Sequence, residues 1–589
     1  MKYSYDDVDG VAAYLFHRGE NAESYGLFGP HRRDGGISFT LYAPRAEKVE
    51  FAAASNDWQG LPMKRDTATG LFQITADVPE GDRYKFKILG PNGWTWKADP
   101  FAFSSEKIPG TASVAVPLES IPVGKILAPP LYSVYECHLG SWMRSEDDDF
   151  LNYRELAHKL VDYVKEMNFS HVELLPIMEH PYDGSWGYQV TGFFSATGRY
   201  GSPQDFAYFI RYAHEKGIGV ILDWPCAHFC KDEQGLRYFD GTPTYESDAP
   251  YFAENRIWDT MAFDFTKPHV RSFLYSSADY FARLGIDGIR VDAVSYMLYK
   301  GFGEEATDTK DPANVREESL YFLKELVGRI KARHPKLLMI AEESEDFPGL
   351  TVMQASGGVG FDRKWNMGWM HDTLKYMEMD PIYRKYHHDA LTFPMVYAFN
   401  ERYILPFSHD EVVHGKKSML NKMYGSYEEK FAQLRLLYLY MVAQPGEKLL
   451  FMGQEFGQFK EWVDHEELEW FLLNYDSHKS LQEFLRALLK IHREHPALSR
   501  PLPAYEGFKW QAVDEKETSS IAFSRIAEEE EEILVACNFT PAETILRLPF
   551  EGTYLRLFDT HMKKEGLTPK DGYLSIKLSP YEGGYFMKA

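Results

Sequence analysis

The chain has 589 residues, with 64 Lys and Arg against 87 Asp and Glu, and a net charge of −23. This length exceeds what one hydrophobic core supports, so about two to four domains are expected. No basic block interrupts the acidic composition, so we do not expect nucleic acid or an anionic membrane surface as a partner. No stretch reaches the roughly 18 apolar residues of a membrane helix, so we do not expect a membrane-spanning segment.

The cysteine content indicates a reducing compartment. The four cysteines, Cys137, Cys226, Cys230 and Cys537, are too few for a disulfide framework in a chain this long. The amino terminus also lacks a basic segment followed by an apolar run, so we expect an unexported, cytoplasmic protein. Cys226, His228 and Cys230 alternate and could in principle hold zinc, but no fourth ligand with finger-like spacing follows. We therefore predict no metal and no cofactor.

The amino-terminal segment has the pattern of a β-sandwich. Short runs alternate apolar and polar residues, with turn residues about every ten positions. We assign residues 1–115 to this sandwich and the proline-rich residues 116–130 to a linker. The sandwich carries Trp58, Trp94 and Trp96, whose faces could stack on sugar rings or could pack as part of a structural brace.

Residues 131–503 alternate strand-length apolar runs with helix-length amphipathic segments, the pattern of repeated βα units. Eight such runs predict a closed barrel. The strand candidates are Ser133–His138, His171–Pro176, Gly219–Asp223, Gly288–Asp292, Leu337–Ala341, a weak one near Gly360–Trp365, Tyr403–Ser408 and Lys448–Met452. The segment from about 226 to 269 is expected as a loop insertion, and residues 504–589 return to short strands that predict a second β-sandwich.

Four stretches end strand-like runs and carry most of the functional information. They are Asp223–His228, Gly288–Ala293, Ile340–Ser344 and Phe407–Glu411. In a parallel barrel the carboxyl ends of the strands converge on one mouth, so these acidic residues can meet around one substrate. Paired carboxylates at such a mouth are the machinery of glycoside chemistry.

The order, residue types and context of these stretches resemble the four signature regions of the α-amylase clan of retaining glycoside hydrolases and transglycosylases. Within the clan, the closest likeness is to the 1,4-α-glucan (glycogen) branching enzymes. It rests on the segments 135–142, 410–416 and 451–457, which read YECHLGSW, DEVVHGK and FMGQEFG, and it extends from about residue 12 to the end of the chain.

The resemblance implies a central TIM (β/α)8 barrel between an amino-terminal β-sandwich similar to carbohydrate-binding modules of family 48 and a carboxyl-terminal all-β sandwich. It implies transfer of α-1,4-glucan segments to a 6-hydroxyl. The expected partner is an α-1,4-glucan such as glycogen, amylose or an amylopectin-like polymer, with no oligomeric state indicated.

Two carboxylates are the candidates for the chemical step. Arg290 and Asp292 are two residues apart on one strand, so both project from the same face, where the cation would keep Asp292 ionised as the nucleophile. Glu342 follows the next apolar run and is the candidate acid/base. The adjacent Glu343 competes for this role, but alternation lets only one face the barrel axis, and the resemblance assigns the role to Glu342.

The remaining site residues come from the resemblance. Asp410 matches the third carboxylate of the clan, which binds sugar hydroxyls and helps to distort the ring. His409 and His228 are expected to hydrogen-bond the same sugar. Tyr188 is expected to stack under it, and Asp223 to hold the site together.

The alternatives to branching are a hydrolase of the same clan and a non-catalytic glucan-binding protein. A hydrolase of the same clan, acting as an amylase or debranching enzyme, differs only in whether water wins the second step. A non-catalytic glucan-binding scaffold is disfavoured by the intact acidic residues. The chain departs from the branching-enzyme pattern at Pro225-Cys226, Cys230 and Phe263-Asp264, where Val-Pro, Pro and Phe-Asn are usual.

Overall fold

The computed structural model describes residues 1–303, 308–528, 531–562, 566–570 and 572–589. The chain divides into two compact units, described separately below. The first unit comprises Met1–Pro129, His138–Val161 and Glu173–Asp362, and the second comprises Pro130–Cys137, Asp162–Val172 and Arg363–Ala589.

Eight strands form a closed barrel, which confirms the predicted fold class. In barrel order they are β11 (Ser133–Cys137), β12 (His171–Leu174), β15 (Gly219–Trp224), β19 (Gly288–Val291), β20 (Leu338–Ala341), β21 (Arg363–Trp365), β22 (Tyr403–Phe407) and β23 (Glu447–Phe451). Each lies within or next to a predicted run, and the weakest candidate forms the short β21. The pairings resolved within each unit, such as β15 with β19, are parallel.

Helices alternate with the barrel strands, as the amphipathic segments predicted. The longer ones are α5 (Pro203–Glu215), α7 (Pro268–Leu284), α9 (Glu317–Arg333), α10 (Met367–Glu378), α15 (Tyr427–Ala443) and α16 (Asp476–Glu494). The short ones are α2 (Leu139–Trp142), α3 (Tyr153–Leu156), α4 (Asp162–Glu166), α6 (Pro250–Ala253), α8 (Val294–Leu298), α11 (Pro381–Arg384), α12 (Asp389–Thr392), α13 (Pro394–Tyr397), α14 (Met419–Lys422) and α17 (Pro496–Ser499). Among the described residues, none of these helices has the length and apolar character that a membrane crossing requires.

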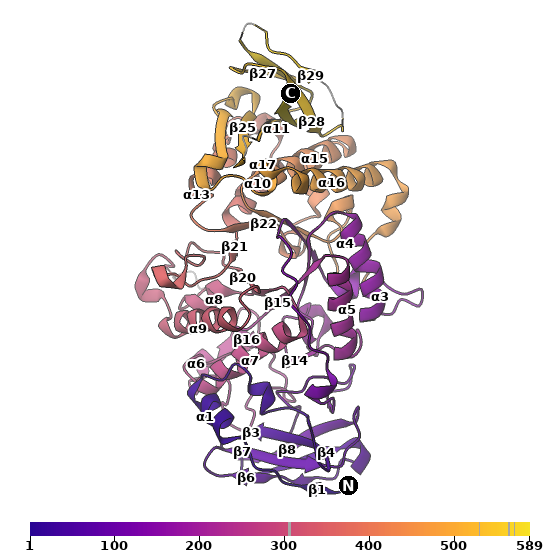
Figure 1. Ribbon diagram of the computed structural model, residues 1–589, viewed down its shortest axis with the longest axis vertical. Helices are drawn as coiled ribbons and strands as arrows, with labels where there is room; N and C mark the ends of the chain where they lie inside the picture. The colour runs from indigo at the N-terminus through magenta and orange to yellow at the C-terminus, as the bar shows by residue number, and fades with distance from the viewer. Residues whose placement is uncertain (304–307, 529–530, 563–565, 571) are drawn as a thin grey trace. The chain divides into compact units, whose positions relative to one another are not determined.

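The amino-terminal sandwich consists of two five-stranded sheets (Figure 1). One contains β1 (Tyr3–Ser4), β7 (Leu71–Ala76), β3 (Gly36–Tyr42), β2 (His31–Arg33) and β6 (Lys64–Asp66). The other contains β10 (Ser113–Val114), β8 (Arg83–Gly90), β4 (Lys48–Ala53), β5 (Leu61–Pro62) and β9 (Gly93–Lys97). The Phe39 ring packs 4.5 Å from Phe51 and 4.7 Å from Tyr84, forming an aromatic core between the sheets.

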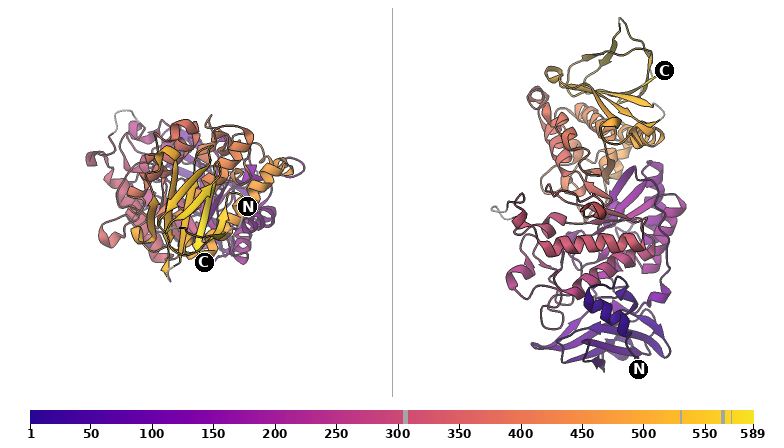
Figure 2. Two further views of the ribbon diagram at one scale, coloured as in Figure 1. Left: turned by 90° about the horizontal axis from the view of Figure 1, so that it is seen from above. Right: turned by 60° about the vertical axis from the view of Figure 1, so that its left-hand side comes forward.

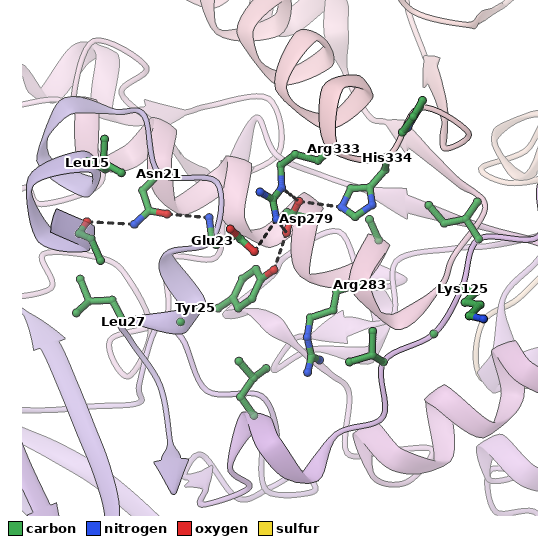
Figure 3. Close-up of a pocket in the computed structure, with 18 of the residues that line it drawn as sticks. Leu15, Asn21, Glu23, Tyr25, Leu27, Lys125, Asp279, Arg283, Arg333 and His334 are labelled. Carbon is green, nitrogen blue, oxygen red and sulfur yellow. Dashed lines mark hydrogen bonds and ion pairs between the residues drawn. The ribbon is translucent and has the colours of Figure 1, made fainter. Parts of the chain in front are cut away.

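A buried polar cluster fastens the amino-terminal segment to the barrel helices of the same unit (Figure 3). Asp279 on α7, whose side chain is 1% exposed, accepts hydrogen bonds from the Tyr25 hydroxyl at 2.6 Å and from Arg333 Nε at 2.6 Å. His334 Nε2 lies 2.9 Å from the same carboxylate. A cavity of about 1010 Å³ beside the cluster is lined by helix α1 (Gly10–Arg18), the linker and α7. The groups at its centre satisfy one another, so the cluster acts as a brace.

The segment between β15 and α7 has secondary structure of its own. It contains β16 (His228–Phe229), β17 (Glu254–Asn255) and β18 (Thr260–Ala262), which form a three-stranded sheet in the order β16-β18-β17. Nearby, β13 (Met178–Glu179) and β14 (Gly192–Ala196) pair in a two-stranded sheet. These short sheets fix the loops that follow the barrel strands.

The carboxyl-terminal segment forms the second predicted sandwich (Figure 2). A six-stranded sheet contains β24 (Phe508–Ala512), β25 (Ser520–Ile526), β26 (Glu532–Asn538), β31 (Gly583–Lys588), β28 (Tyr554–Asp559) and β29 (Gly566–Leu567), and a two-stranded sheet contains β27 (Thr544–Leu548) and β30 (Leu574–Leu578). Leu534, Leu546 and Ile576 belong to the apolar core between them. The Tyr585 hydroxyl donates to the Leu439 carbonyl of α15 at 2.6 Å, which ties this sheet to a barrel helix.

Candidate active site

A buried arginine organises the acidic residues of the first unit. Asp223 on β15 and Arg290 on β19 are register partners, so their side chains leave neighbouring strands side by side. Arg290 Nη1 donates to both carboxylate oxygens of Asp223 at 2.7 Å and to Asp292 Oδ1 at 2.8 Å. Asp292 follows the end of β19. The sequence therefore predicted correctly that Arg290 and Asp292 project from one face.

Neighbouring carboxylates stabilise the positively charged form of Arg290. Burial of the guanidinium, which is 2% exposed, favours its neutral form, but the carboxylates of Asp223 and Asp292 outweigh this and raise the pKa of Arg290 well above its ordinary value. The guanidinium is therefore a permanent cation, and it favours the ionised form of the carboxylate that it contacts.

Glu342 borders the same guanidinium from the next strand. It follows β20, its Oε2 accepts a 2.8 Å hydrogen bond from the Ala293 amide, and it lies 4.0 Å from Arg290 Nη2. Ala293 has a φ of 56°, which an alanine adopts only at a cost in free energy. The Ala293 amide, which directly follows Asp292 in the chain, thus binds Glu342. This hydrogen bond connects the segment that carries Asp292 to the Glu342 carboxylate.

The neighbouring Glu343 is used differently. Its side chain is 1% exposed, and Oε1 accepts hydrogen bonds from Ser295 Oγ at 2.8 Å and from the Glu345 amide at 2.9 Å. These bonds hold α8 against the loop that follows β20. Of the two adjacent acids, only Glu342 is engaged with Arg290 among the described contacts.

Tyr188 extends the same hydrogen-bonded group. Its hydroxyl donates to Asp223 Oδ2 at 2.5 Å and lies 3.5 Å from Arg290 Nη1. The structure thus brings together Tyr188, Asp223, Arg290, Asp292 and Glu342, all of which the sequence predicted as site residues. The Tyr188 hydroxyl is therefore engaged by Asp223.

His228, on β16, is buried beside an exposed aromatic ring. Its imidazole lies 5.1 Å from Trp258, and Nδ1 has no hydrogen-bond partner among the described residues. Burial lowers the pKa of His228 to about 4, so the imidazole is neutral near pH 7. A buried nitrogen without a partner is costly unless a ligand supplies the missing hydrogen bond.

The second unit contains His409 and Asp410, just beyond β22. The His409 amide donates to Glu136 Oε2 at 3.0 Å, and His409 Nδ1 lies 2.6 Å from Glu136 Oε1. His409 Nε2 lies 3.6 Å from Asp410, whose side chain is 53% exposed. The contact with the Glu136 carboxylate favours the tautomer with the proton on Nδ1, and Nε2 is the ring nitrogen on the side of Asp410.

Glu136 is a site residue that the sequence analysis did not identify. It lies in β11 with no exposed surface, and a fully buried glutamate is rare unless it is paired. The signal was present as a single acidic residue in the otherwise strand-like run Ser133–Cys137. Its partner, His409, lies far away in sequence, so the pairing could not be read from local pattern.

The alternating Cys226, His228 and Cys230 are all buried. Burial raises the pKa of the Cys226 thiol well above its ordinary value and raises that of Cys230 to about 11, so both thiols are protonated near pH 7. Cys230 Sγ lies 3.9 Å from Gln189 Oε1. Among the described residues, no group of three or more His, Cys, Asp or Glu side chains is arranged to hold a metal ion.

Three family models match the chain. They are carbohydrate-binding module 48 (isoamylase N-terminal domain) over residues 27–102, the alpha amylase catalytic domain over 140–249 and 238–495, and the alpha amylase C-terminal all-beta domain over 510–583. Their order agrees with the two sandwiches and the barrel. The Trp residues of the first sandwich lie within the first of these matches.

Similar proteins extend over nearly the whole chain. The 1,4-alpha-glucan branching enzyme GlgB of Halothermothrix orenii is 47% identical over 94% of this chain and 92% of its own length, and that of Bacillus caldolyticus is 46% identical over 90% and 82%. Among solved structures, the pullulanase of Anoxybacillus sp. LM18-11 complexed with maltotetraose has a TM-score of 0.76 at 16% identity, covering 99% of this chain and 89% of its own. The last likeness concerns the fold alone.

Proposed function

Because the chain belongs to the family of 1,4-alpha-glucan branching enzymes, we propose that it cuts an α-1,4-glucan chain and transfers the released segment to a glucose 6-hydroxyl by a retaining double displacement. The observation that carries the mechanism is the position of Asp292 and Glu342 on two sides of the Arg290 guanidinium. One carboxylate is paired with the cation, and the other also binds a backbone amide.

In the first step, a carboxylate oxygen of Asp292 attacks C1 of the glucose unit whose α-1,4 bond is cut. The bond from C1 to the oxygen of the departing chain breaks, and Glu342 gives its proton to that oxygen. The departing chain leaves with a free 4-hydroxyl, and a glucosyl ester of inverted configuration remains on Asp292. The cation at 2.8 Å keeps the attacking carboxylate ionised and oriented.

In the second step, the ionised Glu342 takes the proton from the 6-hydroxyl of an acceptor chain. The oxygen of that hydroxyl attacks C1, the ester bond breaks, and Asp292 leaves as a carboxylate. The second inversion restores the α configuration, and the product carries an α-1,6 branch. Glu342 is again protonated for the next cycle.

The other site residues are assigned binding roles. We place the unpartnered Nδ1 of His228 and the Nε2 of His409 on sugar hydroxyls, and the exposed Asp410 on the hydroxyls of the reacting ring. Tyr188 is placed under that ring. Asp223 acts through Arg290 and is therefore a positioning residue.

The natural substrate is proposed to be glycogen or a linear or lightly branched α-1,4-glucan, and the compartment the cytoplasm, which agrees with four free, buried cysteines. Incubation with amylose, followed by iodine absorbance and reducing ends, tests the reaction. Branching lowers the absorbance while reducing ends stay nearly constant. A parallel rise in reducing ends would instead identify an amylase-type hydrolase, whereas a debranching hydrolase would leave both the absorbance and the reducing ends of linear amylose unchanged.

A further inference from the structure

A groove with a volume of about 510 Å³ lies in the first unit, between helix α5, the short helix α3 and the linker. Four basic side chains line it, those of Lys125, Arg154, Arg211 and His214. Among the described residues that line the groove, none is acidic. Since the whole chain has a net charge of −23, this basic lining is a local exception, and it is suited to an anion.

Two of the cations lie over one aromatic ring. Arg154 Cζ lies 4.4 Å from the centroid of the Tyr208 ring, and Arg211 Cζ lies 5.1 Å from the same centroid. The Tyr208 hydroxyl lies 2.9 Å from His158 Nε2, which holds the ring in place. Stacking on a fixed ring orients each guanidinium, while its edge can still bind a ligand.

Both guanidiniums keep hydrogen-bonding capacity. Arg154 Nε donates to Asp205 Oδ1 at 2.5 Å, and Arg211 Nε lies 3.7 Å from Glu215 Oε1. The Nη atoms of these two arginines make no hydrogen bond to any described residue. The arginine side chains are 54% and 67% exposed, so a ligand can reach them. Parallel N–H donors of this kind match the oxygens of a phosphate group.

The third cation is placed by a close approach of the linker to the end of α7. The Gly124 amide donates to the Arg283 carbonyl at 2.9 Å, and a Cβ on Gly124 would lie 2.0 Å from the Leu284 carbonyl oxygen. Only a glycine permits so short a separation. Lys125 follows directly, and its Nζ has neither a hydrogen-bond nor an ion-pair partner among the described residues. The linker therefore presents an unpaired ammonium group at the groove.

His214 completes the basic lining from α5. Its Nε2 lies 2.8 Å from Asp287 Oδ2, and the Asp287 carboxylate also accepts the amides of Val220 and Leu127 at 2.8 Å each. Asp287 has no exposed surface and directly precedes β19. These bonds fix the imidazole and the linker to the barrel, so the groove wall is in place before a ligand arrives.

The rest of the lining is largely apolar. It includes Val123, Ala207, Ile210 and Leu284. Sites for small molecules typically have volumes of about 300–1,000 Å³ and combine apolar walls with a few oriented polar groups. A groove of this size has room for an organic body beside the anionic group. The Tyr208 ring already has two guanidiniums over it, so the lining does not resemble a stacking surface for sugar rings.

We propose that this groove binds an organic phosphate, a small molecule that carries a phosphate ester on an apolar or flat body. Arg154, Arg211 and Lys125 bind the phosphate oxygens, and the body lies against α5 and the end of α7. Sugar phosphates and nucleotides share this chemistry. The groove contains none of the residues of the candidate active site, so the proposal does not depend on the proposed function.

The test is isothermal titration calorimetry on the full-length protein at low salt, with ADP, glucose 6-phosphate and inorganic phosphate as probes. At least one of the two organic phosphates should bind, and more tightly than inorganic phosphate, which lacks the body. The tighter of the two identifies a nucleotide or a sugar phosphate as the ligand class. Added salt should weaken the binding, because the cations are exposed. The proposal is overturned if neither organic phosphate binds, or if neither binds more tightly than inorganic phosphate.

A double variant, Arg211→Gln combined with Lys125→Gln, locates the binding. Affinity for the organic phosphate should fall about tenfold or more, since hydrogen bonds to charged groups contribute more than neutral ones. The matched control, Arg18→Gln combined with Lys490→Gln, removes the same charge from two exposed side chains elsewhere, 59% and 58% exposed. Both double variants should keep the melting temperature and branching activity of the unmodified protein. Equal affinity in the two double variants would show that the ligand binds outside this groove.

Discussion

The candidate carboxylates of the first and the second unit have different surroundings. In the first unit Asp292 is paired with a cation that is itself buried and paired, and its side chain is 13% exposed. In the second unit the Asp410 side chain is 53% exposed, and Oδ1 lies 3.6 Å from His409 Nε2. The proposed nucleophile is therefore held by a buried cation, whereas the carboxylate proposed to bind sugar hydroxyls is more exposed to solvent.

This difference follows from the demands of each role. A nucleophile gains from an orientation that is set before the substrate arrives, because no reorganisation is then needed during the reaction. A group that binds sugar hydroxyls must be accessible to the substrate, which agrees with the greater exposure of Asp410. The variants below test each side of this comparison, from the largest expected effect to the smallest.

The adjacent acids of the first unit test whether the engagement with Arg290 determines the catalytic role. Glu342→Gln should lower branching on the order of 10³-fold, because a general acid/base is removed. Glu343→Gln should retain most activity and instead lower the free energy of unfolding by about 1–2 kcal/mol, because it weakens the bond to Ser295. Activity assays and urea unfolding of both variants give the ranking, and the opposite ranking would move the acid/base role to Glu343.

Acid unfolding tests the environment of His228. Its pKa is about 4 in the folded chain and about 6.5 when unfolded, so between these values the unfolded chain binds a proton that the folded chain does not. Stability is present above pH 6.5 and is lost as the pH falls. Between pH 7 and 4.5 the loss from this group is about 2 kcal/mol.

His228→Gln cannot titrate and should therefore lose about 2 kcal/mol less than the unmodified chain over the same interval. Urea unfolding at the two pH values measures the difference. Equal losses in the two proteins would show that His228 does not titrate as a buried, neutral imidazole.

Glu136→Gln tests the second unit. The substitution preserves shape but replaces a charged acceptor, so His409 loses its preference for the tautomer with the proton on Nδ1. Branching should fall on the order of tenfold to a hundredfold, as expected for loss of a charge-assisted hydrogen bond. A structural role alone would lower the melting temperature without altering the pH profile of kcat. A changed pH profile at an unchanged melting temperature supports positioning of His409.

The smallest expected effect is that of a substitution in the amino-terminal sandwich, which carries exposed tryptophan side chains. Trp94 is 43% exposed with Lys87 Nζ 4.7 Å from its ring centroid, and Trp58 packs 6.4 Å from the less exposed Trp96. Trp94→Ala should weaken amylose binding by about fivefold, corresponding to one stacking contact. If Trp94→Ala has an unchanged affinity for amylose and a lower melting temperature, this surface has a structural role, like the Asp279 cluster.

Sequence patterns predicted the barrel because each strand is a local apolar run, and local signals survive without knowledge of the fold. They located Asp292, Glu342 and Arg290 because these residues immediately follow or end such runs. They could not locate the pair of Glu136 and His409, which is separated by most of the barrel in sequence.

Identification of the residue that carries the glucosyl group is the most direct measurement. The Glu342→Gln variant can be treated with α-maltosyl fluoride, whose fluoride leaves without a proton, while the missing base slows the release of the ester. Digestion and mass spectrometry should then find a maltosyl group on the peptide that contains Asp292. A maltosyl group on another carboxylate, or fluoride release with a product of inverted configuration and no labelled peptide, would contradict the account.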